Sequence, residues 1–499
     1  MKHAMVVLAA VIFTAQTPAL ADVLLAGAAK VEISDRNSGP EVVPCHAKAL
    51  VLRKGETTVA LVTVDAVAIG EIGRIDNGFL SRVRQRLERE TDVPPANLIV
   101  NASHCHGTIR ADVDDLVVAV VKEAVTRLAP ARVGAGTAQE DRISENRRLT
   151  MKDGGEIDMR RAYALPRDEE IAKVGPIDPQ VGILRLDHED GRPLAVVYNF
   201  ACHPIMDPPH KGNSADFPGH ASRLLEAALG DDAVALFVQG CGGDVNPVRY
   251  KESERFPDSA PLGLKLGLTV LTAWKAIETK ADGDLRLVKA DLSLPRAADF
   301  RTRIESIERE RSKLVEGLRP TDINFKSFLP LYIRHRMAPD VPSASRQGYL
   351  HEESLRRDEL TKRDAEDRRA IDDYLRNVAA MERLTRLNVN LALLKKHHER
   401  NEREGKAAIE AEMVGLRVGP FRLLTFPGEL TVTIGMDLKR RAPAPFTFVA
   451  GYTNGYLYYL PTEKQRTNTD YAQEDCDCRV APEWRRLFDA AADELLSRL

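Results

Sequence analysis

Between about residues 24 and 290 the chain alternates short apolar runs, rich in β-branched residues, with amphipathic segments. This alternation is typical of α/β proteins, in which strands and helices form packed layers around a common core. Strand character is found at residues 58–64, 97–101, 181–186, 194–200 and 233–239, and helical periodicity at 79–90, 115–128, 219–229 and 262–279. The pattern therefore predicts an α/β fold.

The region from about residue 300 to 410 differs in composition, because it contains long charged runs with interspersed Leu and Ile. Such runs favour helices with solvated charged faces, so they predict a charged helical insertion. Between the first two runs, residues 325–350 are apolar and interrupted by proline. We interpret this segment as a packed linker, with a lid or a substrate-contacting wall as the alternative. Strand patterns return after residue 411.

The first residues have the pattern of an export signal. Lys2 precedes a short apolar run, which ends in small residues up to Ala21. This pattern predicts a signal peptide over residues 1–21 and an exported protein, periplasmic or secreted. The mature chain has no later apolar run long enough to span a bilayer.

Charge and cysteine content exclude several protein classes. A formal net charge of -3 gives no electrostatic reason to expect nucleic acid or an anionic membrane as a partner. Six cysteines in 499 residues are too few for a small disulfide-stapled fold, although export permits bridges. Cys105, Cys202 and Cys241 each lie in a polar motif, so we expect them to meet in space, either bridged or as buried thiols. Cys476 and Cys478 are too closely spaced for a zinc ribbon.

Two polar segments directly follow apolar runs, which is where α/β proteins usually place chemistry. The segment NASHCHG places His104 and His106 at the end of one such run. This spacing suits a metal ligand and an acid/base group, with ordinary loop histidines as the alternative. His203 follows residues 194–200 in the same way, and a neutral imidazole at a rigid strand end is a good zinc ligand.

Three further segments supply backbone and oxygen groups. The segment LFVQGCGGDVNPV ends an apolar run with three glycines before Asn246. Such a glycine-rich turn lets backbone N–H groups approach an oxyanion closely; the alternative is a tight turn with no catalytic role. Glu429 follows a Pro-Gly pair, where its carboxylate can be a hard ligand. Tyr459 lies in YLYY, where a tyrosine oxygen can complete a zinc sphere; composition alone favours core packing there.

Read together and in this order, these segments resemble the catalytic domain of the neutral/alkaline non-lysosomal ceramidase family. The family patterns ASHTHSG, NFATH, GDVSP, PGE and TNxYxxY are similar to ASHCHG, NFACH, GDVNP, PGE and TNGYLYY in this chain. The resemblance runs from about residue 25 to the C-terminus, with the charged helical region outside it. It implies a mixed-sheet zinc-hydrolase domain over residues 22–499, without the smaller β-sandwich domain that usually follows in the family.

The resemblance also implies one zinc ion per chain. The family binds it through the first histidine of the HxH motif, the histidine of NFATH, the glutamate of PGE and the last tyrosine of TNxYxxY. Those positions correspond here to His104, His203, Glu429 and Tyr459. All four ligand types are retained, which implies an active metalloenzyme.

Four other positions match residues of the family's active site. His106 corresponds to the second active-site histidine, and Arg147 and Tyr471 resemble an arginine and a later tyrosine. Asn246 replaces the serine assigned as nucleophile, and an amide side chain cannot form an acyl-enzyme. The resemblance then implies direct attack on the amide by a water that zinc would activate, with His106 assisting proton transfer, Tyr471 or Arg147 stabilising the oxyanion, and Asn246 donating a hydrogen bond.

The predicted function is therefore zinc-dependent hydrolysis of the N-acyl amide bond of ceramide or a related N-acyl lipid. The expected partner is a small-molecule or lipid amide, with no nucleic acid and no obligate protein partner, and peripheral membrane contact is compatible with this function. Two alternatives stay open. One is a zinc hydrolase of a different, non-lipid amide or ester, and the other is an inactive binding protein that retains the metal.

Overall fold

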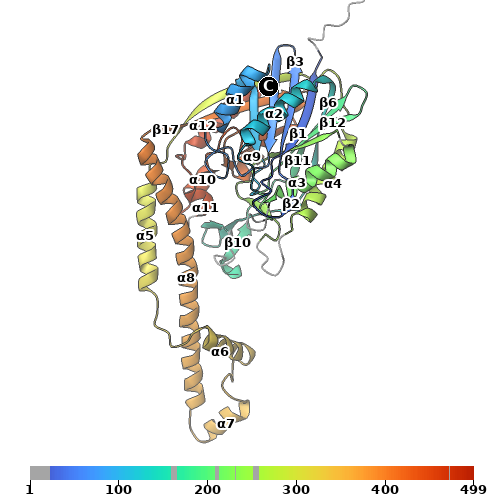
Figure 1. Ribbon diagram of the computed structural model, residues 1–499. Helices are drawn as coiled ribbons and strands as arrows, with labels where there is room; N and C mark the ends of the chain where they lie inside the picture. Colours follow the sequence, from blue (N-terminus) through green and yellow to red (C-terminus); the bar gives the residue numbers. More distant parts are fainter. Residues whose placement is uncertain (1–22, 159–165, 208–212, 231, 251–257, 471) are drawn as a thin grey trace, which may run out of the picture.

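The structure is a computed structural model, and it describes residues 23–158, 166–207, 213–230, 232–250, 258–470 and 472–499. These residues form a body of stacked sheets and helices, from which a long helical arm projects (Figure 1). The predicted signal peptide lies outside the described residues. Among the described helices, none is both long and apolar enough to cross a membrane.

The larger sheet has eight strands, in the order β14-β12-β11-β6-β1-β3-β4-β5. The pairs β12/β14 and β4/β5 are parallel and the other neighbours are antiparallel, so the predicted α/β class with a mixed sheet is confirmed. Its strands are β1 (Leu25–Glu32), β3 (His46–Lys54), β4 (Thr57–Val64), β5 (Leu98–Ala102), β6 (Ala129–Gln139), β11 (Gln180–His188), β12 (Pro193–Phe200) and β14 (Val234–Gln239).

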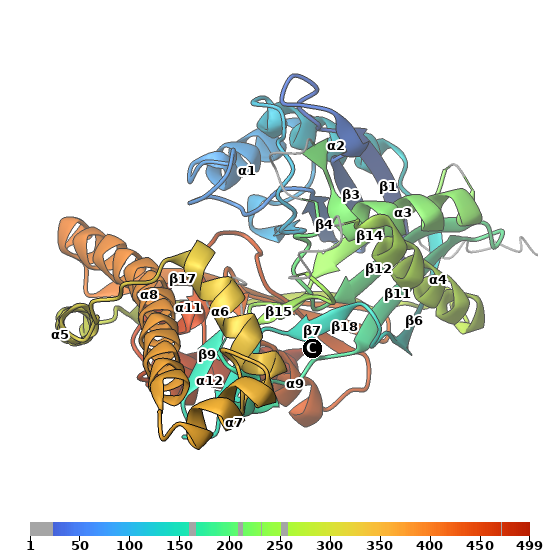
Figure 2. The ribbon, with the colours of Figure 1, turned by 90° about the horizontal axis from the view of Figure 1, so that it is seen from below.

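Alternate side chains of these strands point into two different apolar layers, because successive residues of a strand face opposite sides. In β4, Ala60 and Val62 pack in the layer beneath the first two helices, whereas Val59 and Leu61 pack against a second sheet. Seen from below, α1 and α2 cover one end of the large sheet, and α3 and α4 cover the other (Figure 2). These helices are α1 (Phe79–Glu90), α2 (Val113–Thr126), α3 (Asp216–Leu229) and α4 (Ala260–Ala276).

The second sheet has the order β16-β17-β18-β20. Its strands are β16 (Leu285–Pro295), β17 (Ala408–Val418), β18 (Phe421–Thr425) and β20 (Thr447–Ala450). One face packs on the large sheet, and the other packs on α9 (Val432–Arg441) and α12 (Trp484–Arg498). The body is therefore a helix–sheet–sheet–helix sandwich.

Shorter elements connect these layers and position the loops between them. They are β2 (Glu41–Val43), β7 (Ser144–Asn146), β8 (Arg148–Met151), β9 (Glu156–Asp158), β10 (Ile171–Val174), β13 (Asn213–Ser214), β15 (Val245–Pro247), β19 (Glu429–Leu430), β21 (Tyr459–Leu460), α10 (Glu463–Arg466) and α11 (Gln473–Cys476). The pairs β13/β2, β15/β7 and β19/β21 form two-stranded sheets of their own.

The charged region forms the arm, in which α5 (Phe300–Glu316) runs beside the 46-residue α8 (Glu359–Glu404) (Figure 1). Residues 325–350 connect α5 to α8 and pack on α8, as the packed-linker interpretation expects, but they do so as helices. They contain α6 (Phe325–Met337) and the start of α7 (Arg346–Ser354), and both helices pack on α8 at the far end of the arm. Asn324 begins α6 with a reciprocal capping box, a local signal that outweighs Pro330 in the first turns.

The expected meeting of three cysteines is not observed. Cys105, Cys202 and Cys241 are buried in three different apolar clusters, and all six cysteines are free thiols. Each of the three is a buried thiol that packs as a small apolar group in its own cluster.

Candidate metal and catalytic site

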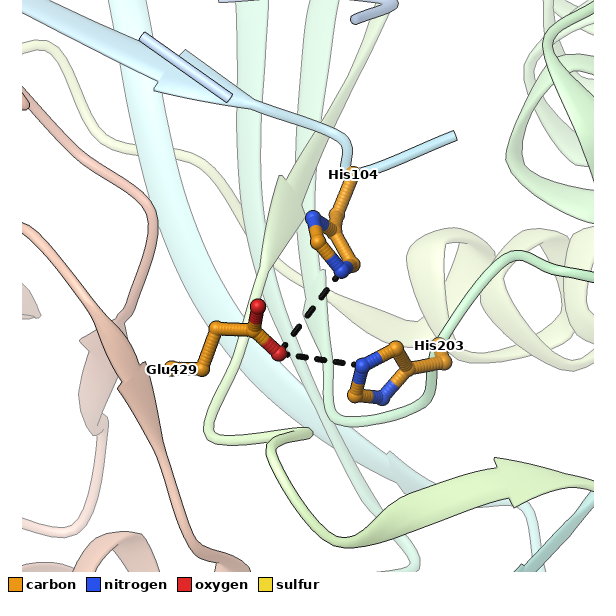
Figure 3. A group of neighbouring side chains, drawn as sticks. All are labelled: His104, His203 and Glu429. Atoms are coloured by element: carbon orange, nitrogen blue, oxygen red, sulfur yellow. Dashed lines mark hydrogen bonds and ion pairs between the residues drawn. The ribbon is translucent and has the colours of Figure 1, made fainter. Parts of the chain in front are cut away.

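Side chains from three strand ends converge inside the body: His104, His203 and Glu429 (Figure 3). Their ligand atoms all lie within 4.8 Å of one another. The Oε2 atom of Glu429 is 3.1 Å from Nε2 of His203 and 3.7 Å from Nε2 of His104. All three side chains are buried, so the group has the composition and spacing of a metal site.

Asn101 explains why the two histidines meet. It lies in β5, just before His104, and its Oδ1 accepts a hydrogen bond from the backbone N–H of Gln239 at the end of β14. Its Nδ2 donates to the carbonyl of Gly451. Since β14 is the parallel neighbour of β12, which ends before His203, this one amide joins the strand ends that carry both imidazoles.

Glu429 and Tyr459 are brought together by a short parallel pairing. They are Cα partners in the register of β19 and β21, and both line the same cavity as the two histidines. The ring of Tyr459 stacks on that of His203, with centroids 6.4 Å apart. The structure thus places all four predicted ligands around one cavity, although the fourth ligand role stays a prediction.

Backbone carbonyls orient both imidazoles. Nδ1 of His104 lies 2.5 Å from the carbonyl oxygen of Val67, and Nδ1 of His203 lies 2.6 Å from that of Gly242. A carbonyl only accepts, so each Nδ1 carries the proton and each Nε2 directs a lone pair toward Glu429. Burial lowers the pKa of His104 to about 4, which keeps its ring neutral near pH 7. Converging nitrogen lone pairs and a carboxylate fit a bound cation such as zinc.

Two tyrosines that the sequence analysis did not assign hold the Glu429 carboxylate. The hydroxyl of Tyr452 donates to Oε2 at 3.2 Å, and that of Tyr456 donates to Oε1. Burial alone would raise the pKa of Glu429, but His104, His203 and Tyr456 lower it well below its usual range, so the group is ionised. The available signal was the close repetition of tyrosines between residues 452 and 459.

The backbone at His104 is strained. Its φ of 67° lies in the left-handed region, which costs a non-glycine residue about 1 kcal/mol or more. The surrounding structure holds this conformation, because the N–H of Ser103 bonds to Val64 and that of His104 bonds to Ala66. The strain turns the imidazole out of the strand direction and into the cavity (Figure 3).

Among the predicted catalytic residues, His106 lines the cavity, and its ring centroid is 5.6 Å from that of His104. Tyr471 lies outside the described residues. The position of His106 is compatible with proton transfer near the cluster, and that role stays a prediction.

Arg147 also lines the cavity, where its guanidinium is buried and heavily engaged. Nε donates to Glu474 at 2.7 Å, Nη2 donates to the carbonyl of Gly243, and the guanidinium carbon lies 5.3 Å from the ring centroid of Tyr459. Asn246 accepts a hydrogen bond from Nη1 at 3.2 Å and is not among the residues that line the described cavity. Asn246 therefore contacts a cavity residue, Arg147, without lining the described cavity itself.

The cavity in front of the cluster has a volume of about 270 Å³. Among the described residues of the arm, only Lys396 of α8 lines it, and none from α6 or α7 does. The alternative of a substrate-contacting wall at residues 325–350 therefore has no support from this cavity. The root of α8 forms part of the wall instead.

Comparison with solved structures identifies the architecture. The crystal structure of neutral ceramidase from Pseudomonas aeruginosa matches with a TM-score of 0.57 and 16% identity, over 96% of this chain and 75% of that chain. A ceramidase complexed with C2 matches with a TM-score of 0.56 and 16% identity, over 96% and 76%. This chain has the neutral ceramidase fold. Neither protein-family models nor curated protein sequences gave a match. The resemblance is thus confirmed for the fold, while the ligand set and residue roles stay predictions.

Proposed function

We propose that this protein is a zinc-dependent amidohydrolase that cleaves an N-acyl amide bond at the cluster of His104, His203 and Glu429. The observation that carries the proposal is the convergence of two oriented imidazoles and an ionised carboxylate in a cavity of the neutral ceramidase fold. Nitrogen and oxygen ligands of this kind suit zinc, with Tyr459 as the proposed fourth ligand.

A zinc ion held at this cluster supplies Lewis acidity, which polarises a carbonyl and lowers the pKa of water. His106 lines the cavity and is the proposed group that gives a proton to the leaving amine. Arg147 is the proposed positioning residue for Tyr459, and Asn246 hydrogen-bonds its guanidinium. In this role Arg147 does not contact the substrate with free N–H donors. Tyr471 keeps its proposed role at the oxyanion.

The fold and the cavity both support the proposed substrate class. Ceramide is the first amide to test, because the fold is that of neutral ceramidase. A cavity of about 270 Å³ accommodates the amide and its immediate neighbours, whereas a long acyl chain extends beyond it. This size equally supports a shorter, non-lipid amide as the second candidate. Export through residues 1–21 is part of the proposal.

The first test is the metal content of the purified mature protein beside its His203→Ala variant. We expect about one zinc per chain in the wild type and none in the variant, because removing an imidazole breaks the ligand set. His351→Ala is a matched control, since His351 is exposed on α7, and it should retain the metal. A wild-type protein that binds no zinc would contradict the proposal.

The second test separates an enzyme from a metal-retaining binding protein. His106→Ala should keep its zinc and lose at least a hundredfold in hydrolysis, because general acid catalysis typically contributes factors of roughly 10² to 10⁴. The assay is release of fatty acid from a fluorescent ceramide and from short N-acyl amides. Zinc without release of any acyl group in the wild type would favour the binding protein.

A further inference from the structure

The root of the arm contacts the cavity through two neighbouring residues of α8. The ring of His397 packs edge-on against Tyr458, with centroids 4.8 Å apart. The Nζ atom of Lys396 lies 4.3 Å from the centroid of the same ring. Tyr458 and Lys396 both line the cavity, so α8 places an ammonium group at its wall.

Lys396 differs from the other cationic side chain of the described cavity, Arg147. The Arg147 guanidinium is buried and donates to Glu474 and to Gly243. Lys396 is exposed, and among the described residues its ammonium has no hydrogen bond or ion pair. An aromatic face attracts a cation without forming an ion pair, so the three N–H donors of Lys396 stay available for a ligand.

The acidic side chains of the cavity are engaged elsewhere. Glu429 belongs to the metal cluster, and Oδ1 of Asp477 lies 2.6 Å from Nε2 of His397. Oδ2 of Asp207 accepts hydrogen bonds from two serine hydroxyls, Ser214 and Ser259. None of these carboxylates makes an ion pair with Lys396 in the described part of the chain.

We propose that Lys396 is a specificity-determining residue that binds an anionic group of the substrate at the exposed rim of the cavity. The inference rests on the proposed function and deepens it, because it names the substrate class. The preferred substrates are N-acyl amides that carry a carboxylate or a phosphate, ahead of neutral amides. The metal cluster then holds the amide while α8 binds the anion, which gives the arm a direct role at the site.

The test uses three amides with one acyl group: N-hexanoylglycine, N-hexanoyl phosphoethanolamine and neutral N-hexanoylethanolamine. Wild-type protein, Lys396→Met and Lys395→Met are compared by kcat/KM. Lys395 is a matched control, because it is the adjacent lysine of α8 but pairs with Glu308 at 2.7 Å, away from the cavity. Lys396→Arg, which retains the positive charge, tests whether a cationic side chain at this position is enough for activity on the anionic amides.

We expect the wild type to prefer an anionic amide, and its choice between carboxylate and phosphate identifies the anion. Lys396→Met should lower kcat/KM for the anionic amides about tenfold, mainly through KM, because a hydrogen bond to a charged group is lost. Its activity on the ethanolamide should be unchanged, and Lys395→Met should behave like the wild type.

Binding is measured in parallel by calorimetry in the His106→Ala background, so this readout does not need turnover. Binding of N-hexanoylglycine or the phosphate that is lost with Lys396→Met supports the anion site even if no amide is hydrolysed, in which case the proposed function alone fails. A wild type that prefers the ethanolamide, or a Lys396→Met variant that weakens all three amides equally, overturns the inference and leaves amide hydrolysis standing.

Discussion

At the scale of single residues, the carboxylate of Glu429 is held from both sides. Tyr452 contacts Oε2 and Tyr456 contacts Oε1, while the imidazoles approach Oε2. Groups that orient a metal ligand typically change metal affinity by 10- to 100-fold when they are removed. Removing a tyrosine hydroxyl should therefore weaken metal binding, even though the carboxylate of Glu429 is itself unchanged.

Tyr456→Phe should weaken zinc binding by about tenfold, because Oε1 of Glu429 loses its donor and the carboxylate is freer to rotate. The dissociation constant is measured by competition with a chelator of known affinity. Tyr458→Phe is the control, since its hydroxyl lies 3.4 Å from Glu71 and not at Glu429. Equal affinities for the two variants would show that the hydroxyl of Tyr456 does not orient the ligand.

At the scale of elements, the C-terminal end of α8 is fastened to the body by ion pairs. Glu404 accepts from Arg400 one turn earlier, from Arg296 beside β16 and from Arg479 at 3.1 Å. Burial by itself would raise the pKa of Glu404, but Arg400 and Arg296 lower it to about 2. The folded state therefore favours the charged form of this group.

Glu404→Gln should lower the free energy of unfolding by about 1 kcal/mol at pH 7, because the group is partly exposed and screened. A depressed pKa stabilises the folded state above the unfolded value near 4.5, and this contribution disappears as the pH falls toward 2. The difference between wild type and variant should thus shrink below about pH 4.5.

The measurement for Glu404→Gln is denaturant unfolding at several pH values between 7 and 3. Glu402→Gln is the control, because its exposed carboxylate lies 3.4 Å from His398 of the same helix, and no ion pair joins it to another element among the described residues. A difference between wild type and Glu404→Gln that stays constant with pH would contradict the assigned cause.

At the scale of the whole molecule, the arm has two separate apolar clusters. The cluster near the body contains Ile307, Leu387 and Leu394, whereas the far cluster of Phe328, Leu331 and Ile371 packs only arm residues. The far end of the arm therefore has a small apolar cluster of its own and is not part of the core of the body.

A shortened arm tests this division. Arg319 and Asn377 are joined by two hydrogen bonds, so a short Gly/Ser linker between residues 319 and 377 can replace the far end. We expect zinc content and the melting temperature of the body to be unchanged, because Lys396 and the near cluster are retained. Metal analysis and thermal unfolding check this. Loss of zinc would mean that the far end supports the site.

Much of the fold was predictable because its signals are local. The helix expected at residues 79–90 is α1 with the same bounds, and the strand expected at 194–200 is β12, longer by one residue. His104 and His203 were also recognisable as candidate ligands, since each follows an apolar run, whereas the set of four that includes Glu429 and Tyr459 came from the resemblance to the ceramidase family. The helices within residues 325–350 were not predicted, because the far end of α8 covers their apolar side chains, which is a contact between distant parts of the chain.

The sequence by itself determined the α/β alternation, the helical region and the polar segments at strand ends, because hydrophobic period and strand-end position are properties of neighbouring residues. Only the tertiary structure decided which of these residues meet. Asn101 joins strand ends more than a hundred residues apart, and Tyr452 reaches Glu429. Asn246 accepts a hydrogen bond from Arg147, and α8 brings Lys396 to the cavity. Such contacts depend on how the layers pack, which no local pattern records.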